Sequence, residues 1–262
     1  MKKALLYLVV FLAVQIIGTY AVMLVWSWAG GVAVDERMMT SAPVVIVSSA
    51  VYSLIVLVIF LVCRWCVVSR TYLKTRPVGV LFWVVIAALG TIIPSEWLLE
   101  QLQLPDTNAE VFAQVMASPW GYVAICIFAP LVEEVVFRGA ILRELLTAYR
   151  PWVAIIVSAL FFAAAHFNPA QMPHAFIIGV LMGWMYWRTG SILPGILLHW
   201  VNNTVAYVVA NLYPGMFDLT LGDLFGGNQQ RVLMAVAFSF CLLLPALFQL
   251  NQRMKRAEED DR

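Results

Sequence analysis

The stretch Pro119–Tyr149, PWGYVAICIFAPLVEEVVFRGAILRELLTAY, decides the fold that we expect for this chain. After its first residue the only proline is Pro130, so one long helix is expected. At 1.5 Å per residue this helix would run ~46 Å, whereas the hydrocarbon core of a bilayer is ~30 Å thick. The stretch therefore predicts a membrane-spanning helix whose last turns, with Arg143 and Glu144, project into the cytosol.

The composition of the whole chain agrees with a membrane protein. Hydrophobic residues make up 63% of the 262 residues, and charged residues only 12%. Mean hydropathy is +0.87. A soluble domain is ~45–50% apolar, so the excess apolar surface is expected to face lipid. The net charge of +1 and the lack of a long basic run give no reason to expect a nucleic-acid partner.

These observations predict an all-α polytopic membrane protein with about eight transmembrane helices. We place the spans near residues 4–28, 43–63, 77–94, 119–149, 152–167, 174–187, 191–210 and 231–250. The first run is longer than the ~7–15 apolar residues of a signal peptide, so we interpret it as a retained span. The chain then divides into N-terminal helices with an acidic outer loop (1–118), a core (119–210), and a last helix with a charged tail (211–262).

The positive charges predict the orientation. With the N-terminus in the cytosol, 14 of the 16 Lys and Arg residues fall on the cytoplasmic side, and only Arg37 and Arg231 fall outside. This distribution favours an even number of spans, with both termini cytoplasmic. The loop 95–118 is acidic, lies outside in this layout and is expected to include an interfacial helix. We expect an integral protein of a bacterial inner (plasma) membrane, with the charged tail Arg256–Arg262 solvated.

Two shorter patterns have ordinary structural interpretations. Cys63 and Cys66 have the spacing of a redox motif but lie at the end of a span, so we expect free thiols. Gly179 and Gly183 form a GxxxG pattern in the sixth span. Close helix packing within the chain is the favoured interpretation, and association of two copies through this face is the alternative.

Ionisable and amide side chains are rare inside membranes and usually functional. In this chain they concentrate in the fourth, fifth and seventh spans, at Glu133, Glu134, Arg138, His166, His199, Asn202 and Asn203. Glu133 lies 17 residues before Arg150, and His166 lies 16 residues after it. Along two antiparallel helices both distances are ~25 Å, so these two side chains are expected to face each other, with His199 at a comparable depth.

Helical spacing separates these residues by role. Glu134 and Arg138 are four residues apart and share a face, where pairing offsets the cost of two buried charges. Glu133 points ~100° away from Glu134 and is left to meet another group. Phe162 and His166 are also four residues apart, so the ring can pack beside the imidazole.

The seventh span adds a second polar face. His199 and Asn203 are four residues apart and adjacent, whereas Asn202 points elsewhere. His174, beside Pro173, is assigned no role. Each of these features alone also has a purely structural interpretation, such as an asparagine that bonds two helices together.

The three patterns together resemble the CPBP family. They are Glu133-Glu134-x-x-x-Arg138, Phe162-x-x-x-His166 and His199-x-x-x-Asn203, in this order on successive helices. This is the family of type II CAAX prenyl endopeptidases and of bacteriocin-processing or self-immunity (Abi) proteins. The resemblance covers about 119–210 and implies an intramembrane peptidase with an eight-span helical fold.

The resemblance also implies roles for the side chains. Glu133 and His166 would hold and activate a water molecule, and His199 and Asn203 would stabilise the oxyanion. The supporting residues would be Glu134, Arg138 and Phe162. A catalytic zinc ion is an open alternative, since two histidines and a glutamate are a donor set that zinc accepts; the ligands would be Glu133, His166 and His199.

Three functions remain open at this point. The first is an endopeptidase that cuts a CAAX-type substrate, a bacteriocin or another membrane peptide near the cytoplasmic face. The second is a non-catalytic scaffold or self-immunity protein of the same fold, which would bind a peptide or a partner. The third is a transporter with Glu133, Glu134 and His166 as a proton relay, although the internal repeats common in transporters are not visible.

Overall fold

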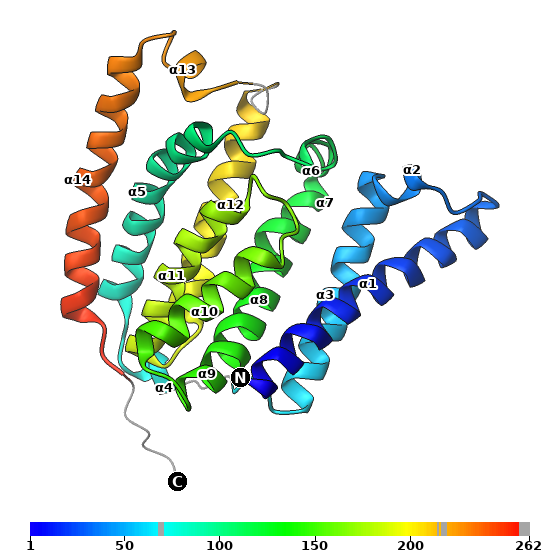
Figure 1. Cartoon of the computed structure of the whole chain (residues 1–262), viewed down its shortest axis with the longest axis horizontal. Helices are drawn as coiled ribbons and strands as arrows, with labels where there is room; N and C mark the ends of the chain where they lie inside the picture. Colours follow the sequence, from blue (N-terminus) through cyan, green and yellow to red (C-terminus); the bar gives the residue numbers. More distant parts are fainter. Residues whose placement is uncertain (68–70, 214, 216–218, 257–262) are drawn as a thin grey trace.

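The computed structural model describes residues 1–67, 71–213, 215 and 219–256. Within these ranges all regular structure is helical, which confirms the predicted all-α class. Seven long helices are α1 (Lys2–Gly30), α3 (Ala42–Val62), α5 (Val78–Leu102), α10 (Pro151–Ala164), α11 (Met172–Thr189), α12 (Leu193–Leu212) and α14 (Gln229–Arg253). They occupy seven of the eight predicted span positions (Figure 1).

The eighth position, the predicted span 119–149, is a helix in five consecutive segments. These are α7 (Pro119–Gly121), η1 (Tyr122–Phe128), α8 (Ala129–Glu133), η2 (Glu134–Leu142) and α9 (Arg143–Leu146), of which η1 and η2 are π-helical. Short helices in the connections are α2 (Glu36–Met39), α4 (Thr71–Lys74), α6 (Ala109–Met116) and α13 (Leu221–Leu224). The acidic loop contains α6, and an interfacial position of this helix stays a prediction.

Two predicted boundaries are wrong. α5 does not stop at Pro94 but continues to Leu102, since a proline is tolerated inside a membrane helix. Next to Pro94, the Ser95 hydroxyl donates to the Thr91 carbonyl, 2.5 Å away. α10 ends at Ala164, three residues before the predicted end of its span, so His166 lies in the turn that follows.

Four helices are long and apolar enough to cross a membrane: α1, α3, α5 and α14. α10 has only 14 residues, and the helix that contains η1 and η2 is segmented. The chain is an integral membrane protein by its apolar helices, while the crossing of all eight helices and their orientation stay predictions. Arg70 and residues 257–262 of the charged tail lie outside the described residues.

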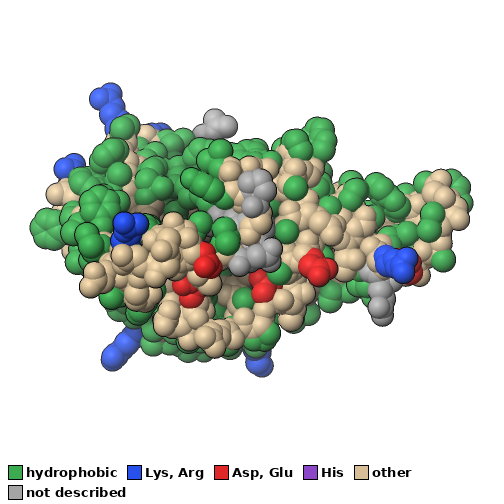
Figure 2. Space-filling model, turned by 90° about the horizontal axis from the view of Figure 1, so that it is seen from above, with side chains coloured by type: hydrophobic (Ala, Val, Ile, Leu, Met, Phe, Trp, Pro, Cys, Tyr) green, Lys and Arg blue, Asp and Glu red, His purple; other side chains and the backbone are tan. Residues whose placement is uncertain are grey.

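The N-terminus and the end of α14 lie at the same end of the molecule (Figure 1), as an even number of crossings requires. Acidic side chains lie across the middle of the opposite end (Figure 2). α14 packs along α5, α10 packs along α11, and α1 packs along α3 and leans away from the other helices. The hydrophobic core lies around η2 and includes Phe137, Ile141 and Phe162.

Small residues bring the helices close together. A Cβ at Gly179 would lie 3.1 Å from Cβ of Ala159, and one at Gly183 would lie 3.1 Å from Ile155, so both glycines pack on α10 within the chain. Association of copies through this motif remains untested. Cys63 and Cys66 are free thiols, as predicted; Cys66 is buried where a Cβ at Gly139 would lie 2.2 Å from its sulfur.

Candidate active site

Glu133 and Glu134 lie at a junction between two kinds of helix. Glu133 is the last residue of α8, and Glu134 is the first residue of η2. π-helical turns are rare and occur frequently at functional sites. In η2 the Phe137 carbonyl accepts a hydrogen bond of 3.0 Å from the Ser158 hydroxyl of α10, so part of the π-helical backbone is bonded from outside its own helix.

The predicted ion pair between Glu134 and Arg138 is present and buried. Their side chains are 0% and 1% exposed, and Oε1 of Glu134 accepts from Nη1 of Arg138 at 2.5 Å. The other Arg138 nitrogen, Nη2, donates to the Gly179 carbonyl of α11 at 3.1 Å. The guanidinium carbon also lies 4.4 Å from the centre of the Phe162 ring of α10. The pair therefore joins η2 to both α10 and α11.

The second oxygen of Glu134 faces the start of α12. A Cβ at Gly195 would lie 2.2 Å from Oε2 of Glu134, so only glycine leaves room for the carboxylate at this position. Gly195 is the third residue of α12. A carboxylate is stabilised there by the partial positive charge of the helix N-terminus. The Glu134–Arg138 pair thus contacts α10, α11 and α12 besides its own helix.

Glu133 is in a different environment from its neighbour. Its side chain is 20% exposed, and Oε2 lies 3.8 Å from Nε2 of His199. This separation is too long for a direct hydrogen bond but suits one bridging water or a reacting group. Among the described residues Oε2 of Glu133 and Nδ1 of His199 have no hydrogen-bond partner. The atom of His199 that faces Glu133 is Nε2, so Oε2 of Glu133 is the unsatisfied buried atom at this gap.

The Phe162 ring holds both predicted imidazoles. Its centre lies 5.0 Å from the His166 ring and 5.8 Å from the His199 ring, each in an edge-to-face arrangement. His166 is fixed further through Nδ1, which lies 2.9 Å from the Phe162 carbonyl. The carboxylate–imidazole contact of the site is formed with His199, whereas the sequence predicted that Glu133 would face His166 directly.

The turn that carries His166 is anchored through Asn168, two residues further along the chain. Asn168 is fully buried, and its Nδ2 donates to Oδ1 of Asp106 at 2.8 Å. Its Oδ1 accepts from the Thr107 backbone N–H at 3.3 Å. The acidic connection before α6 therefore holds the His166 turn in place, which the sequence did not indicate.

Asn203 is oriented by neighbours on both sides of its amide. Its Nδ2 donates to the Ile125 carbonyl of η1 at 2.9 Å, and its Oδ1 accepts from Nδ2 of Asn202 at 3.2 Å. η1, the other π-helical segment, therefore also accepts a hydrogen bond from outside its own helix. In this arrangement one Nδ2–H of Asn203 is engaged and one remains for a ligand.

His174, which was assigned no role, belongs to the same network. Its Nδ1 lies 2.9 Å from the Ser95 hydroxyl of α5, and its Nε2 lies 3.1 Å from Oδ1 of Asn202. A continuous chain of hydrogen bonds thus runs from α5 through α11 to Asn203 on α12. Asn202 was the available signal, since it points away from the His199 face and needs a partner of its own.

The donor geometry does not complete the predicted zinc site. Within the described ranges no three His, Cys, Asp or Glu side chains are grouped closely enough to hold a metal ion. Glu133 and His199 would supply two of the donors that zinc requires. The zinc set of Glu133, His166 and His199 stays a prediction, and no step below is routed through a metal.

The comparisons with known proteins cover the same segment. Residues 115–205 match the family model described as type II CAAX prenyl endopeptidase Rce1-like. The match covers about a third of the chain, so this segment is similar to the CAAX-type intramembrane proteases of the CPBP family. It contains all the residues of the three sequence patterns.

A curated relative is similar to this chain over a shorter range. An uncharacterized 24.3 kDa protein of Escherichia coli is 33% identical over 82 residues, which are 29% of this chain and 38% of that relative. The matched part is thus well under half of the relative's length. No solved structure matches the chain.

Proposed function

We propose that this protein is an intramembrane endopeptidase in which Glu133 activates a water molecule for attack on a peptide bond. The observation that carries the proposal is the gap of 3.8 Å between Nε2 of the buried His199 and Oε2 of Glu133, a buried oxygen without a hydrogen-bond partner among the described residues. Such a pair can hold a water molecule or the reacting atoms between its members.

The reaction follows from this arrangement. Glu133 takes a proton from the water, whose oxygen attacks the peptide carbonyl carbon while the carbonyl π electrons move to oxygen. His199 and Asn203 stabilise that oxygen, and His166 helps to hold the water. When the intermediate collapses, the C–N bond breaks and Glu133 returns its proton to the amine nitrogen. Donors fixed in a water-poor site stabilise the oxyanion more than water would.

The fixed positions of these side chains support the assignment. The Phe162 ring positions both imidazoles, and the guanidinium of Arg138, paired with Glu134, packs on the face of that ring. We assign Glu134, Arg138 and Phe162 to positioning rather than to chemistry, because the ion pair is fully buried and its guanidinium contacts both the Gly179 carbonyl and the Phe162 ring.

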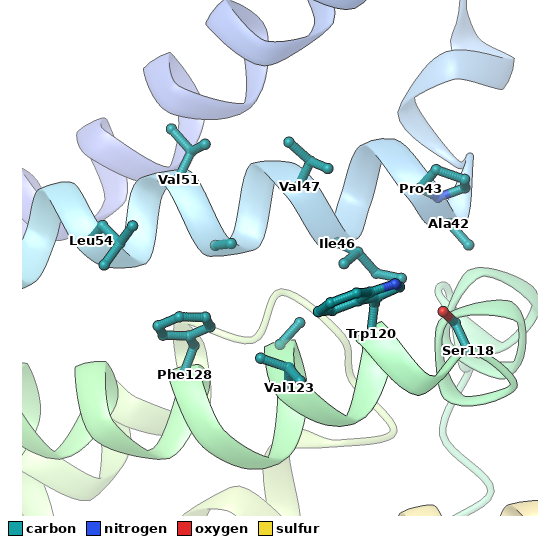
Figure 3. A pocket seen from close by; sticks show the side chains of 12 residues that line it. Ala42, Pro43, Ile46, Val47, Val51, Leu54, Ser118, Trp120, Val123 and Phe128 are labelled. Atoms are coloured by element: carbon teal, nitrogen blue, oxygen red, sulfur yellow. The ribbon is translucent and has the colours of Figure 1, made fainter.

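An apolar cavity offers the substrate a route from the lipid. It measures about 520 Å³ and lies between α3 and η1. Leu54 and Phe128 face each other at one end and Ser118 lies at the other (Figure 3). Glu133 follows Phe128 by five residues on the same helix. We propose that the apolar part of the substrate occupies this cavity.

The substrate class follows from the family together with this cavity. The curated family description names CAAX prenyl endopeptidases, and an apolar cavity suits a lipidated C-terminus or an apolar membrane peptide such as a bacteriocin. We place the reaction near the cytoplasmic face of a bacterial inner membrane, on the positive-inside argument. The alternative, a scaffold or self-immunity protein of the same fold, would bind such peptides without cutting them.

The experiment compares new peptide N-termini in native membranes that carry either the wild-type protein or Glu133→Gln. Fragments found only with the wild type would support proteolysis and name its substrates. If the two membranes gave identical N-termini while both proteins were folded and equally abundant, the scaffold or immunity alternative would replace the protease.

A further inference from the structure

A second cavity lies far from Glu133, at the end of the molecule that carries the N-terminus. It measures about 380 Å³ and is formed where the first turn of α5 meets the last turn of α14, with α4 beside them. Its lining includes three cationic side chains, from Arg76, Arg253 and Lys255, and the described lining residues include no carboxylate. A basic cavity between two membrane helices at the membrane surface is a recognised site for lipid headgroups.

The start of α5 adds backbone donors to this cavity. α5 begins at Val78 after Pro77, and no side chain caps its first turn. The first N–H groups of a long helix carry a partial positive charge and bind anions. The Arg253 guanidinium rests on this turn, since a Cβ at Gly79 would lie 3.4 Å from its Nη1. Two positive groups in contact repel each other unless an anion lies between them.

The Tyr72 hydroxyl provides an independent observation. The side chain lines the cavity and is 3% exposed, and its buried oxygen has no hydrogen-bond partner in the part of the chain that the structure describes. Burial raises the pKa of Tyr72 to about 12, so the group keeps its proton and remains a donor. A buried hydroxyl without a partner is unfavourable, and a ligand oxygen in the cavity would satisfy it.

The cationic side chains at the end of α14 are not needed to cap that helix. Arg188 of α11 already donates to the carbonyls of Asn251 and Met254, at 2.9 and 3.4 Å. Arg253 donates through Nε to Gln249 at 2.9 Å, which orients the guanidinium without using the Nη nitrogens in that bond. Arginine forks bind phosphate oxygens through two parallel hydrogen bonds.

We infer that this cavity binds a phosphate group, held by Arg76, Arg253 and Lys255, the Tyr72 hydroxyl and the first turn of α5. The phosphate belongs either to a membrane lipid headgroup or to a free phosphate compound, and the chemistry of recognition is the same. The inference rests on contacts outside the candidate active site and holds whether or not the protein is a protease.

Thermal unfolding of the full-length protein in a neutral detergent tests the inference with three probes. They are short-chain phosphatidylglycerol, diacylglycerol with the same chains but no phosphate, and inorganic phosphate. Phosphatidylglycerol is expected to raise the melting temperature by about 2–4 °C, and diacylglycerol to leave it unchanged. A shift with inorganic phosphate as well would support a free phosphate source, whereas a shift with phosphatidylglycerol alone would support a lipid. An equal shift with diacylglycerol would overturn the inference, as would the lack of a shift with either phosphate probe both in this protein and in the tail variant described below.

Matched variants separate a site from general charge attraction. Arg76→Gln with Arg253→Gln should abolish the shift, whereas Arg37→Gln with Arg231→Gln, which removes the same charge from the opposite end, should retain it. Equal loss in both double variants would mean that only net charge matters and would contradict a site.

Tyr72→Phe is the sharper test because it changes no charge. Without ligand this variant should unfold at the same or a higher temperature, since it loses only an unpartnered hydroxyl. With phosphatidylglycerol its shift should be smaller than that of the wild type. A full shift in Tyr72→Phe would contradict the assigned ligand contact.

The acidic run Glu258–Asp261 follows the cavity residues in the sequence and could compete with a phosphate. The titrations are therefore repeated on a full-length variant in which these four residues carry amides. If the melting temperature did not shift in this variant either, competition by the tail could not explain the result, and the inference would be overturned.

Discussion

Two adjacent glutamates at the centre of this molecule have opposite surroundings. Glu134 is completely buried and bonded to Arg138, while Glu133 is 20% exposed and faces His199 across a gap. One helical step of ~100° is enough to produce this difference. A buried pair that loses one member leaves an uncompensated charge, whereas a residue that faces a gap can be changed with little effect on packing. The two glutamates should therefore respond differently to substitution.

Glu133→Gln should abolish cleavage and leave stability unchanged. Glutamine keeps the shape of the side chain but cannot accept the proton of the attacking water. Cleavage of a substrate found in the native-membrane comparison, measured beside the melting temperature, tests this. Retained cleavage in Glu133→Gln would remove this residue from the chemistry.

Arg138→Ala should mainly reduce the amount of folded protein. It removes the partner of buried Glu134 and the bond to the Gly179 carbonyl, a loss of about 3–5 kcal/mol for a buried pair. The measurement is the yield and melting temperature of purified protein, with Arg143→Ala as a control, since Arg143 is exposed on the next segment of the same helix. A stable but inactive Arg138→Ala protein would instead make the guanidinium part of the reaction.

His174→Ala should slow cleavage about 10- to 100-fold without abolishing it, because it frees Asn202 and thereby Asn203 to move. Ser95→Ala removes only the far end of the hydrogen-bond chain and should have a smaller effect. If positioning is the cause, His174→Gln should recover part of the rate, and the loss should lie in kcat rather than KM. Equal activity in wild type and His174→Ala would limit this network to packing.

Helix positions were predictable from the sequence, but helix type was not. Long apolar runs marked every long helix, because burial in lipid requires about 20 consecutive apolar residues. The π-helical segments η1 and η2 were not predicted, and each accepts a hydrogen bond from a residue of another helix, Ser158 or Asn203. The same is true of the end of α10, where distant Asn168 and Asp106 fix the turn that carries His166. The polar residues of the site were found because they are rare in spans, whereas the pairing of Glu133 with His199 required the positions of three helices.

The space between α3 and η1 gives a prediction about an element rather than a residue. Ala50→Trp should fill part of the apolar cavity and reduce cleavage at least about tenfold. Val58→Trp is the control, because Val58 lies on the same helix and is exposed on its surface. Both variants should fold, so the ratio of their cleavage rates is the measurement. Equal rates would contradict substrate access between these helices.

The number of membrane crossings determines where the candidate active site lies. If only α1, α3, α5 and α14 crossed, residues 103–228 would form one large segment on the outer side. α10 argues against this layout. Trp152, Ile156 and Leu160 recur at four-residue intervals on one face of α10, and they are 52%, 43% and 52% exposed. Such a stripe would be a large apolar patch in water but is ordinary in lipid. α10 is ~21 Å long, and local thinning of the bilayer can accommodate a short helix.

The two layouts place Arg150 on opposite sides of the membrane. With eight crossings the connection between α9 and α10 is cytoplasmic, and with four it is external. A cysteine at Arg150, in a chain with the exposed Cys63 and Cys241 changed to alanine, should react with a membrane-impermeant maleimide only after the cells are permeabilised. A cysteine at Gln101, at the end of α5, should react in intact cells under both layouts and serves as the control for access. Labelling of Arg150→Cys in intact cells would place the candidate active site in an external segment and refute cleavage near the cytoplasmic face. Protection of Arg150→Cys, with Gln101→Cys labelled, would support crossings by the helices that carry Glu133, His199 and their partners.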